Sequence, residues 1–238
     1  TPLYSSAASD VYKRQVRKSS FLKKSLQWAS LIQNKRYLGI WIVSLITTLA
    51  VLVIVGLYLC YNESRTSGTV LNDFVLDRIL PRDVSTILFS ITWICILGGL
   101  PVLLRTPERA MRVFWGISVM GLTRCIVMYL VPLEPPIGII PLRDPFVEGA
   151  FYDNKVLVKD LFFSGHTSNM VLLTLLMDIK WLKIILAFAS AAVGYLLLVQ
   201  HVHYAIDIVA APFFAYLAYR AAFAIADRLV PKCFRVIP

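Results

Sequence analysis

The chain has 238 residues, of which 58% are hydrophobic and only 16% are charged. With a mean hydropathy of +0.71, this composition excludes an ordinary soluble globular domain. The formal charge of +10 is not arranged in a basic stripe with interleaved aromatic residues, so nucleic acid is not an expected partner. Because the apolar residues form several long runs, the predicted class is an all-α polytopic membrane protein whose cations face anionic lipid.

The first residues of the chain have an unusual composition. Residues 1–15 contain neither the apolar centre nor the cleavage site of a signal peptide. The run Asp10–Gln15 resembles translated sequencing adapter, so we expect native sequence to begin near Val16. We assign residues 1–36 to a basic N-terminal segment, residues 37–224 to a membrane domain, and residues 225–238 to a C-terminal tail.

Six apolar segments are predicted to be helices of a transmembrane bundle, each judged against the roughly 20 residues that cross a bilayer. They are Tyr37–Leu59, Val84–Leu104, Met111–Val131, Ser168–Ile179, Lys183–Val199 and Tyr204–Phe223. The fourth segment is short. It approaches spanning length only if its helix begins near Ser164.

The distribution of Lys and Arg predicts the orientation. With six spans, the side that holds both termini carries 17 of these residues, and the opposite side carries six. Omitting residues 1–15 leaves 15 against six. By the positive-inside rule, both termini are expected in the cytoplasm.

All three histidines fall in or beside connections on the predicted exoplasmic face. His203 and Asp207 are four residues apart, so on a helix they share one face, and Asp207 can accept the Nδ1 proton of His203. This pattern is typical of an activated nucleophile or base. His201 is interpreted as a polar anchor, because a spacing of two turns it away from His203. A metal site made of His201, His203 and Asp207 is the alternative.

The run Ser164-Gly165-His166-Thr167 predicts a second functional element. A turn of small residues at the start of a helix presents backbone N–H groups and the positive end of the helix dipole, which together favour phosphate. His166 is placed to protonate a leaving alkoxide. Asp160 is placed to exchange a proton with His166 or to keep it charged.

These residues resemble a known family. Asp160-Leu-Phe-Phe-Ser-Gly-His-Thr167 and His203-Tyr-Ala-Ile-Asp207 are similar to the last two motifs of the sphingomyelin synthase family, within the type 2 phosphatidic acid phosphatase superfamily. Leu71–Asp77, and Arg112 with Thr123–Tyr129, resemble degenerate forms of the first two motifs. The resemblance implies a six-helix membrane bundle and transfer of a phosphorylated head group.

The resemblance also implies residue roles. His203 attacks the phosphorus of a phospholipid, Asp207 orients the imidazole, and His166 protonates the leaving diacylglycerol and then activates the acceptor. The residues assigned to substrate binding are Asp160, Ser164, Gly165, Thr167, Arg124 and Tyr204. No metal or other cofactor is implied. The expected partners are membrane phospholipids and a lipid alcohol, with water as the acceptor in the alternative of a phosphatase or phospholipase; a catalytically silent scaffold is the remaining alternative.

Departures from the motifs bear on the substrate. Val158-Lys159 replaces the Cys-Gly of the third motif, and Ala205 replaces the Thr of the last. Leu197 stands where the broader superfamily has an Arg, and no Lys-x6-Arg-Pro motif occurs. The shortage of cations favours a phosphodiester over a dianionic monoester. Arg124, inside the third span, is expected either to bind the donor phosphate or to pair with a carboxylate.

Overall fold

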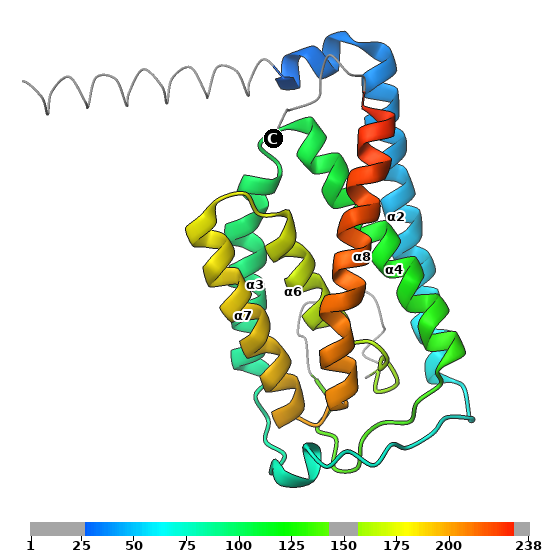
Figure 1. Ribbon diagram of the computed structural model, residues 1–238. Coiled ribbons are helices and arrows are strands. Elements are labelled where there is room, and N and C mark those ends of the chain that lie inside the picture. Colours follow the sequence, from blue (N-terminus) through cyan, green and yellow to red (C-terminus); the bar gives the residue numbers. More distant parts are fainter. Residues whose placement is uncertain (1–26, 143–156, 231–238) are drawn as a thin grey trace, which may run out of the picture.

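The structure is a computed structural model that describes residues 27–142 and 157–230. In these residues it is an all-helical bundle (Figure 1). Five helices are long and apolar enough to cross a membrane: α2 (Lys35–Glu63), α3 (Ser85–Leu103), α4 (Pro107–Leu130), α7 (Lys180–Val199) and α8 (Ala205–Leu229). The predicted all-α membrane fold is therefore confirmed. The predictions for residues 1–15 and for residues 231–238 lie outside the described residues.

Local capping explains where the first long helices begin. The side chain of Asn34 accepts a hydrogen bond of 3.0 Å from the backbone N–H of Tyr37, at the start of α2. At the start of α4, Thr106 caps the backbone N–H of Arg109, and Pro107 occupies the first helical position, where a missing N–H costs nothing. Both ends therefore follow from sequence signals that precede the apolar runs.

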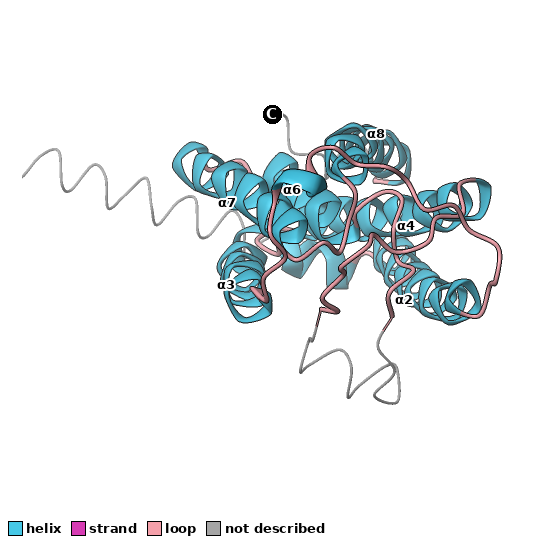
Figure 2. Ribbon diagram, turned by 90° about the horizontal axis from the view of Figure 1, so that it is seen from below, coloured by secondary structure: helices cyan, strands magenta, loops and turns pink. Residues whose placement is uncertain are grey.

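The fourth predicted span is a short helix, α6 (Gly165–Leu176), of 12 residues. It begins next to Ser164, as expected, but ends three residues before Ile179. At 1.5 Å per residue it covers about 18 Å of the roughly 30 Å hydrocarbon core. Six complete spans are therefore not confirmed. Viewed along the bundle, α6 occupies the centre and packs against α3, α4, α7 and α8 (Figure 2).

Small residues bring the helices around α6 close together. Ala211, Ala215, Ala218 and Ala222 form a buried stripe on α8, which packs against α4 and α6. Such stripes let helix backbones approach in membrane proteins. The outer surface is apolar instead, and Phe188 is 75% exposed. An apolar exterior around a packed interior is the pattern expected where the solvent is lipid.

The connections at one end of the bundle are joined by backbone hydrogen bonds. The segment after α2, which includes the 3₁₀ helix η1 (Leu76–Arg78), and the segment after α4 both lie at this end, drawn at the bottom of Figure 1. Thr69 forms an isolated bridge with Leu133. The N–H of Ile140 donates to the carbonyl of Gln200, which follows α7, at 3.1 Å. These contacts fix the loops against one another and against the end of α7.

Candidate active site

The Ser-Gly-His-Thr turn forms the N-terminal cap of α6. Ser164 is the cap residue, and its Oγ accepts a hydrogen bond of 3.3 Å from the backbone N–H of Thr167. The Ser164 hydroxyl also donates to Oγ1 of Thr167 at 3.1 Å. Both side chains are buried. Ser164 and Thr167 therefore hold the turn, and the helix dipole points its positive end at the space beyond Gly165 and His166.

Arg124 of α4 reaches this helix start from within the bundle. Its Nε donates to the carbonyl of Phe163 at 3.2 Å, and a terminal guanidinium nitrogen pairs with Asp160. A Cβ atom built on Gly165 would lie 2.5 Å from this guanidinium. Only glycine lets the α6 backbone approach Arg124 so closely. The pairing expected as one alternative for Arg124 is thus present, with Asp160 as the carboxylate.

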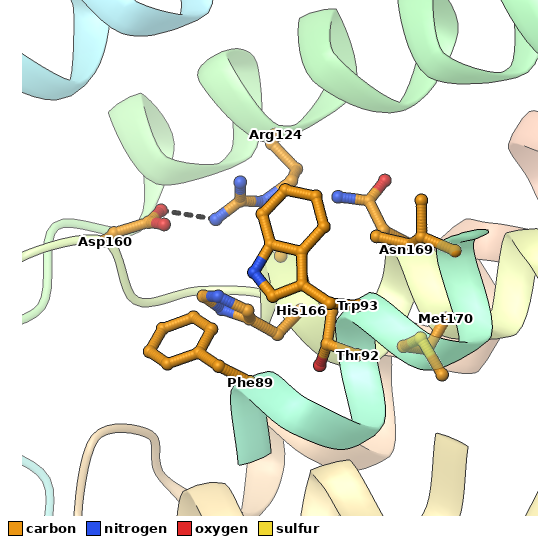
Figure 3. Close-up of a pocket in the computed structure, with 10 residues that line it drawn as sticks. Phe89, Thr92, Trp93, Arg124, Asp160, His166, Asn169 and Met170 are labelled. Carbon is orange, nitrogen blue, oxygen red and sulfur yellow. Dashed lines mark hydrogen bonds and ion pairs between the residues drawn. The ribbon is translucent and has the colours of Figure 1, made fainter. Parts of the chain in front are cut away.

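A cavity of about 230 Å³ opens beside these groups (Figure 3). Four of the predicted site residues line it: Arg124, Asp160, Gly165 and His166. The rest of the described lining consists of Phe89, Thr92, Trp93, Ile96, Asn169 and Met170. The cavity therefore joins a cation, a carboxylate and an imidazole to an apolar wall supplied mainly by α3.

The sequence analysis missed three polar or amphipathic residues in this cavity. Asn169 lies three residues after His166, so helical spacing alone could have placed it on the same face. Thr92 and Trp93 lie inside the apolar run of α3, where nothing in the pattern separates a cavity residue from a lipid-facing one. Phe89 packs edge to face against His166, with ring centroids 5.8 Å apart.

His203 and Asp207 form a buried pair at the start of α8. Nδ1 of His203 lies 3.2 Å from Oδ2 of Asp207, and the side chains are 2% and 0% exposed. The same Oδ2 accepts the backbone N–H of Tyr204 at 3.0 Å. The pair differs from its prediction in one respect. His203 precedes α8, so the contact is made by the cap of the helix and not along one helical face.

The two motifs adjoin through the backbone. The N–H of Ser164 donates to the carbonyl of Asp207 at 3.3 Å, so the first turn of α8 lies against the cap of α6. Among the described residues, His203, Tyr204 and Asp207 do not line the cavity that contains His166 and Arg124. The pair therefore lies beside that cavity, behind the turn that bears Ser164.

Tyr204 points away from the cavity and holds two loops. Its hydroxyl donates to the carbonyl of Glu134 at 2.9 Å and accepts the N–H of Leu71 at 3.1 Å. Burial raises the pKa of the Tyr204 phenol despite the hydrogen bond from Leu71, so the hydroxyl stays protonated and able to donate. Tyr204 therefore joins the loop after α2 to the loop after α4.

Asp73 is a second carboxylate at the start of α8. Its Oδ2 accepts the N–H of Ala205 at 2.6 Å, and its Oδ1 accepts the N–H groups of Val75 and Leu76 at 2.9 and 3.3 Å. It therefore caps both η1 and α8. Through α8, Asp73 holds the segment that carries the His203–Asp207 pair.

The segment before Asp160 is anchored to the end of α2. Oε2 of Glu63 accepts the N–H groups of Val158 and Lys159, both at 3.0 Å. Nζ of Lys159 bonds Oε1 of Glu134 at 2.9 Å. Lys159 stands where the resembled motif has Gly. Its contacts help to fix the backbone segment that places Asp160 next to Arg124.

His201 bridges two loops and takes no part in a metal cluster. Its Nδ1 lies 3.2 Å from the carbonyl of Ile137, and its Nε2 lies 2.8 Å from the carbonyl of Ile79. Neither nitrogen is left over for a ligand. In the described residues, no group of three or more His, Cys, Asp or Glu side chains is placed to hold a metal ion.

Comparison with known proteins gives one family match. Residues 159–224 match a protein-family model described as PAP2 superfamily C-terminal. The match covers both motifs of the site and supports the type 2 phosphatidic acid phosphatase superfamily, whose members are lipid-modifying membrane enzymes. No curated protein matches the chain. The apolar helices indicate an integral membrane protein, and the family match suggests phospholipid phosphatase or phosphotransferase chemistry.

Proposed function

We propose that this chain is a phospholipid head-group transferase similar to the sphingomyelin synthases. It would move a phosphorylated head group from a glycerophospholipid to a lipid alcohol such as ceramide. One observation supports the proposal above the others: the buried His203–Asp207 pair is bonded through Ser164 to a helix start where Arg124 and His166 line a cavity.

The reaction has two balanced steps, and the first requires that His203, which is buried and does not line the cavity in this structure, becomes accessible to a phosphorus bound there. In the first, Nε2 of His203 attacks phosphorus while Asp207 holds the Nδ1 proton, and the bond from phosphorus to the glycerol oxygen breaks. His166 gives its proton to the departing diacylglycerol alkoxide. In the second, His166 takes the proton of the acceptor hydroxyl, whose oxygen attacks phosphorus. The phosphorus–nitrogen bond then breaks, and the product lipid leaves with His203 restored.

The charges in the cavity favour a phosphodiester as donor. Apart from His166, which is protonated before the first step, Arg124 is the one cation among the described lining residues, and Asp160 already pairs with it. The remaining stabilisation comes from the start of α6, whose dipole contributes about half a positive charge. A phosphodiester carries one negative charge, which this amount of positive charge can stabilise, whereas a phosphomonoester dianion would need more cations.

The orientation is part of the proposal. The end of the bundle that bears the His203–Asp207 pair would face the exoplasmic side, with both termini in the cytoplasm, because Lys and Arg are concentrated at the other end. Glycosylation or cysteine labelling of the loop at 64–70 in intact membranes, compared with the turn at 177–179, measures this directly. Labelling of 177–179 from outside would contradict the orientation.

The deciding experiment is a product analysis. Purified protein is incubated with labelled phosphatidylcholine, phosphatidylethanolamine and phosphatidylinositol plus ceramide, and the labelled lipids are identified by mass spectrometry. We expect a labelled sphingolipid and diacylglycerol in equal amounts. His203→Ala and His166→Ala are expected to abolish turnover while leaving helix content and membrane insertion unchanged. Normal turnover in either purified variant would refute the assignment.

Hydrolysis is the second candidate, because the family match suggests phosphatase as well as phosphotransferase chemistry. The same chemistry with water as acceptor releases the head group or inorganic phosphate. Omitting ceramide separates the two functions, since a transferase then stops after one turnover per enzyme and a hydrolase does not. Activity that disappears with EDTA and returns with zinc would favour a metal mechanism instead.

A further inference from the structure

A second cavity, of about 290 Å³, lies at the opposite end of the bundle from His166. It is formed where α4 and α7 begin and where α6 and α8 approach their ends. Along α4, Arg112 in this cavity is 12 residues, or about 18 Å, from Arg124. The two cavities are therefore separate sites.

Cations exceed carboxylates in the described lining of this second cavity. Arg109, Arg112 and Lys183 supply three positive charges, against the two carboxylates of Glu108 and Asp178. These carboxylates are already paired: Glu108 pairs with Arg112, and Asp178 pairs with Arg109 at 2.5 Å. Asp227, which is outside the described lining, also lies 3.4 Å from Arg112. The positive charge of Lys183 thus remains without a carboxylate partner among the described residues.

Two donors in this cavity lack a good acceptor in the described part of the chain. Nε of Arg112 is buried and has no hydrogen-bond partner there. It is held in place, because the guanidinium carbon lies 4.0 Å from the centre of the Phe223 ring. Nζ of Lys183 reaches only the carbonyl of Leu175, at 3.5 Å. A buried donor without a partner calls for an explanation, and an acceptor from outside the chain is one.

We propose that this cavity binds a phosphate group, either of an anionic lipid or of a free phosphate compound. A phosphate oxygen in the cavity can accept from Nζ of Lys183, and from Nε of Arg112 once that buried nitrogen is uncovered. The volume lies near the lower limit of ligand pockets, so it suits a phosphate and not a whole lipid. In the orientation predicted from Lys and Arg, this end faces the cytoplasmic leaflet, where anionic lipids are concentrated. The site is independent of the proposed transferase reaction.

Hydrogen exchange of the purified full chain, read by mass spectrometry, tests the site. Dioctanoyl phosphatidic acid is titrated in detergent, with inorganic phosphate and dioctanoyl phosphatidylcholine in parallel. We expect saturable protection at 107–112 and 175–183, separate from any change at 164–169. Protection by phosphatidic acid alone would identify a lipid head group, and equal protection by inorganic phosphate would identify a free anion. Equal protection by phosphatidylcholine would overturn the proposal.

The matched variants lie on one helix. Lys183→Gln removes the unpaired cation and is expected to weaken binding at least tenfold, whereas Lys183→Arg keeps the charge and should retain binding. Lys180→Gln removes an exposed cation from the same helix that does not line the cavity, and it should bind like the unmodified chain. Unchanged binding in Lys183→Gln, or equal losses in Lys183→Gln and Lys180→Gln, would refute the site.

Discussion

The two ends of the bundle use their carboxylates differently. At the end where α6 and α8 begin, Asp73, Glu63 and Asp207 accept backbone N–H groups, although Asp160 and Glu134 there pair with Arg124 and Lys159. At the other end, three carboxylates pair with arginine side chains instead; they are Glu108, Asp178 and Asp227. Backbone partners fix a group in position, while side-chain pairs balance charge and can rearrange. The first end therefore holds more of its backbone in fixed positions, and the second end mainly balances charge between side chains.

The largest expected effect tests the end of the bundle where α6 and α8 begin. Asp207→Asn places an amide against His203 and favours the tautomer that carries its proton on Nε2, so the imidazole cannot attack. We expect a loss of roughly 10³ to 10⁴ in kcat, with little change in KM. Asp227→Asn, on the same helix at the other end, is the control and should stay within about twofold. Similar losses in both variants would remove the distinction between the ends.

The second test concerns close approach at the start of α6. Gly165→Ala adds a Cβ that would lie 2.5 Å from the Arg124 guanidinium, so the guanidinium or the turn must move. We expect kcat/KM to fall by about 10²-fold, as for a displacement of about 1 Å. Gly98→Ala, where no atom lies within 4 Å of the added Cβ, should behave normally in the same assay. Equal behaviour of the two variants would show that this approach is not needed.

The third effect is smaller and separates positioning from chemistry. Asp73→Ala removes the cap that bonds Ala205, Val75 and Leu76, and loss of a cap costs about 1 kcal/mol of unfolding free energy. Because Asp73 holds the segment with His203, kcat is expected to fall more than KM changes. Asp77→Ala, an exposed neighbour in η1, is the control. A loss of stability with unchanged kcat would limit Asp73 to a structural role.

The smallest expected effect comes from a substitution at the opposite end of the bundle, in the Arg109–Asp178 pair. Burial would raise the pKa of Asp178, but the hydrogen bond and charge of Arg109 outweigh it and keep the pKa below its usual value. The stabilisation is therefore present above the unfolded pKa and is lost as the pH falls through the folded one. We expect Asp178→Asn to lower the thermal midpoint slightly at pH 7, and we expect this difference to shrink in acid as the Asp178 carboxylate of the unmodified chain becomes protonated. A difference that persists in acid would contradict this pairing.

Most of the helices could be predicted because apolar runs, caps and prolines mark them locally. Each of the six predicted segments overlaps a helix of the structure. The end of α6 was wrong because hydropathy continues through Met177 and Ile179 while the backbone at Met177 is already extended. No local polar signal at Leu176 marks that stop. The end is fixed by the turn into α7.

The candidate site was predicted where chemistry follows from short motifs, and missed where it depends on distant contacts. Ser164 and His166 could be placed at a helix start from four consecutive residues. The contact between His203 and Asp207 was predicted, but the backbone that makes it is a cap. The packing of Arg124 on Gly165 joins residues 41 positions apart, and no spacing rule connects them. Trp93 was missed for the same reason.

The shortness of α6 has a consequence for how a lipid meets this protein. Its first residue lies well inside the rim of the bundle, and the chain leading to it is non-helical, with Leu161, Phe163 and Ser164 buried by protein. Irregular backbone at such depth is tolerated only where protein or a water-filled space covers it. If the proposed function holds, a lipid substrate would meet Arg124 and His166 inside the bundle and not at its rim.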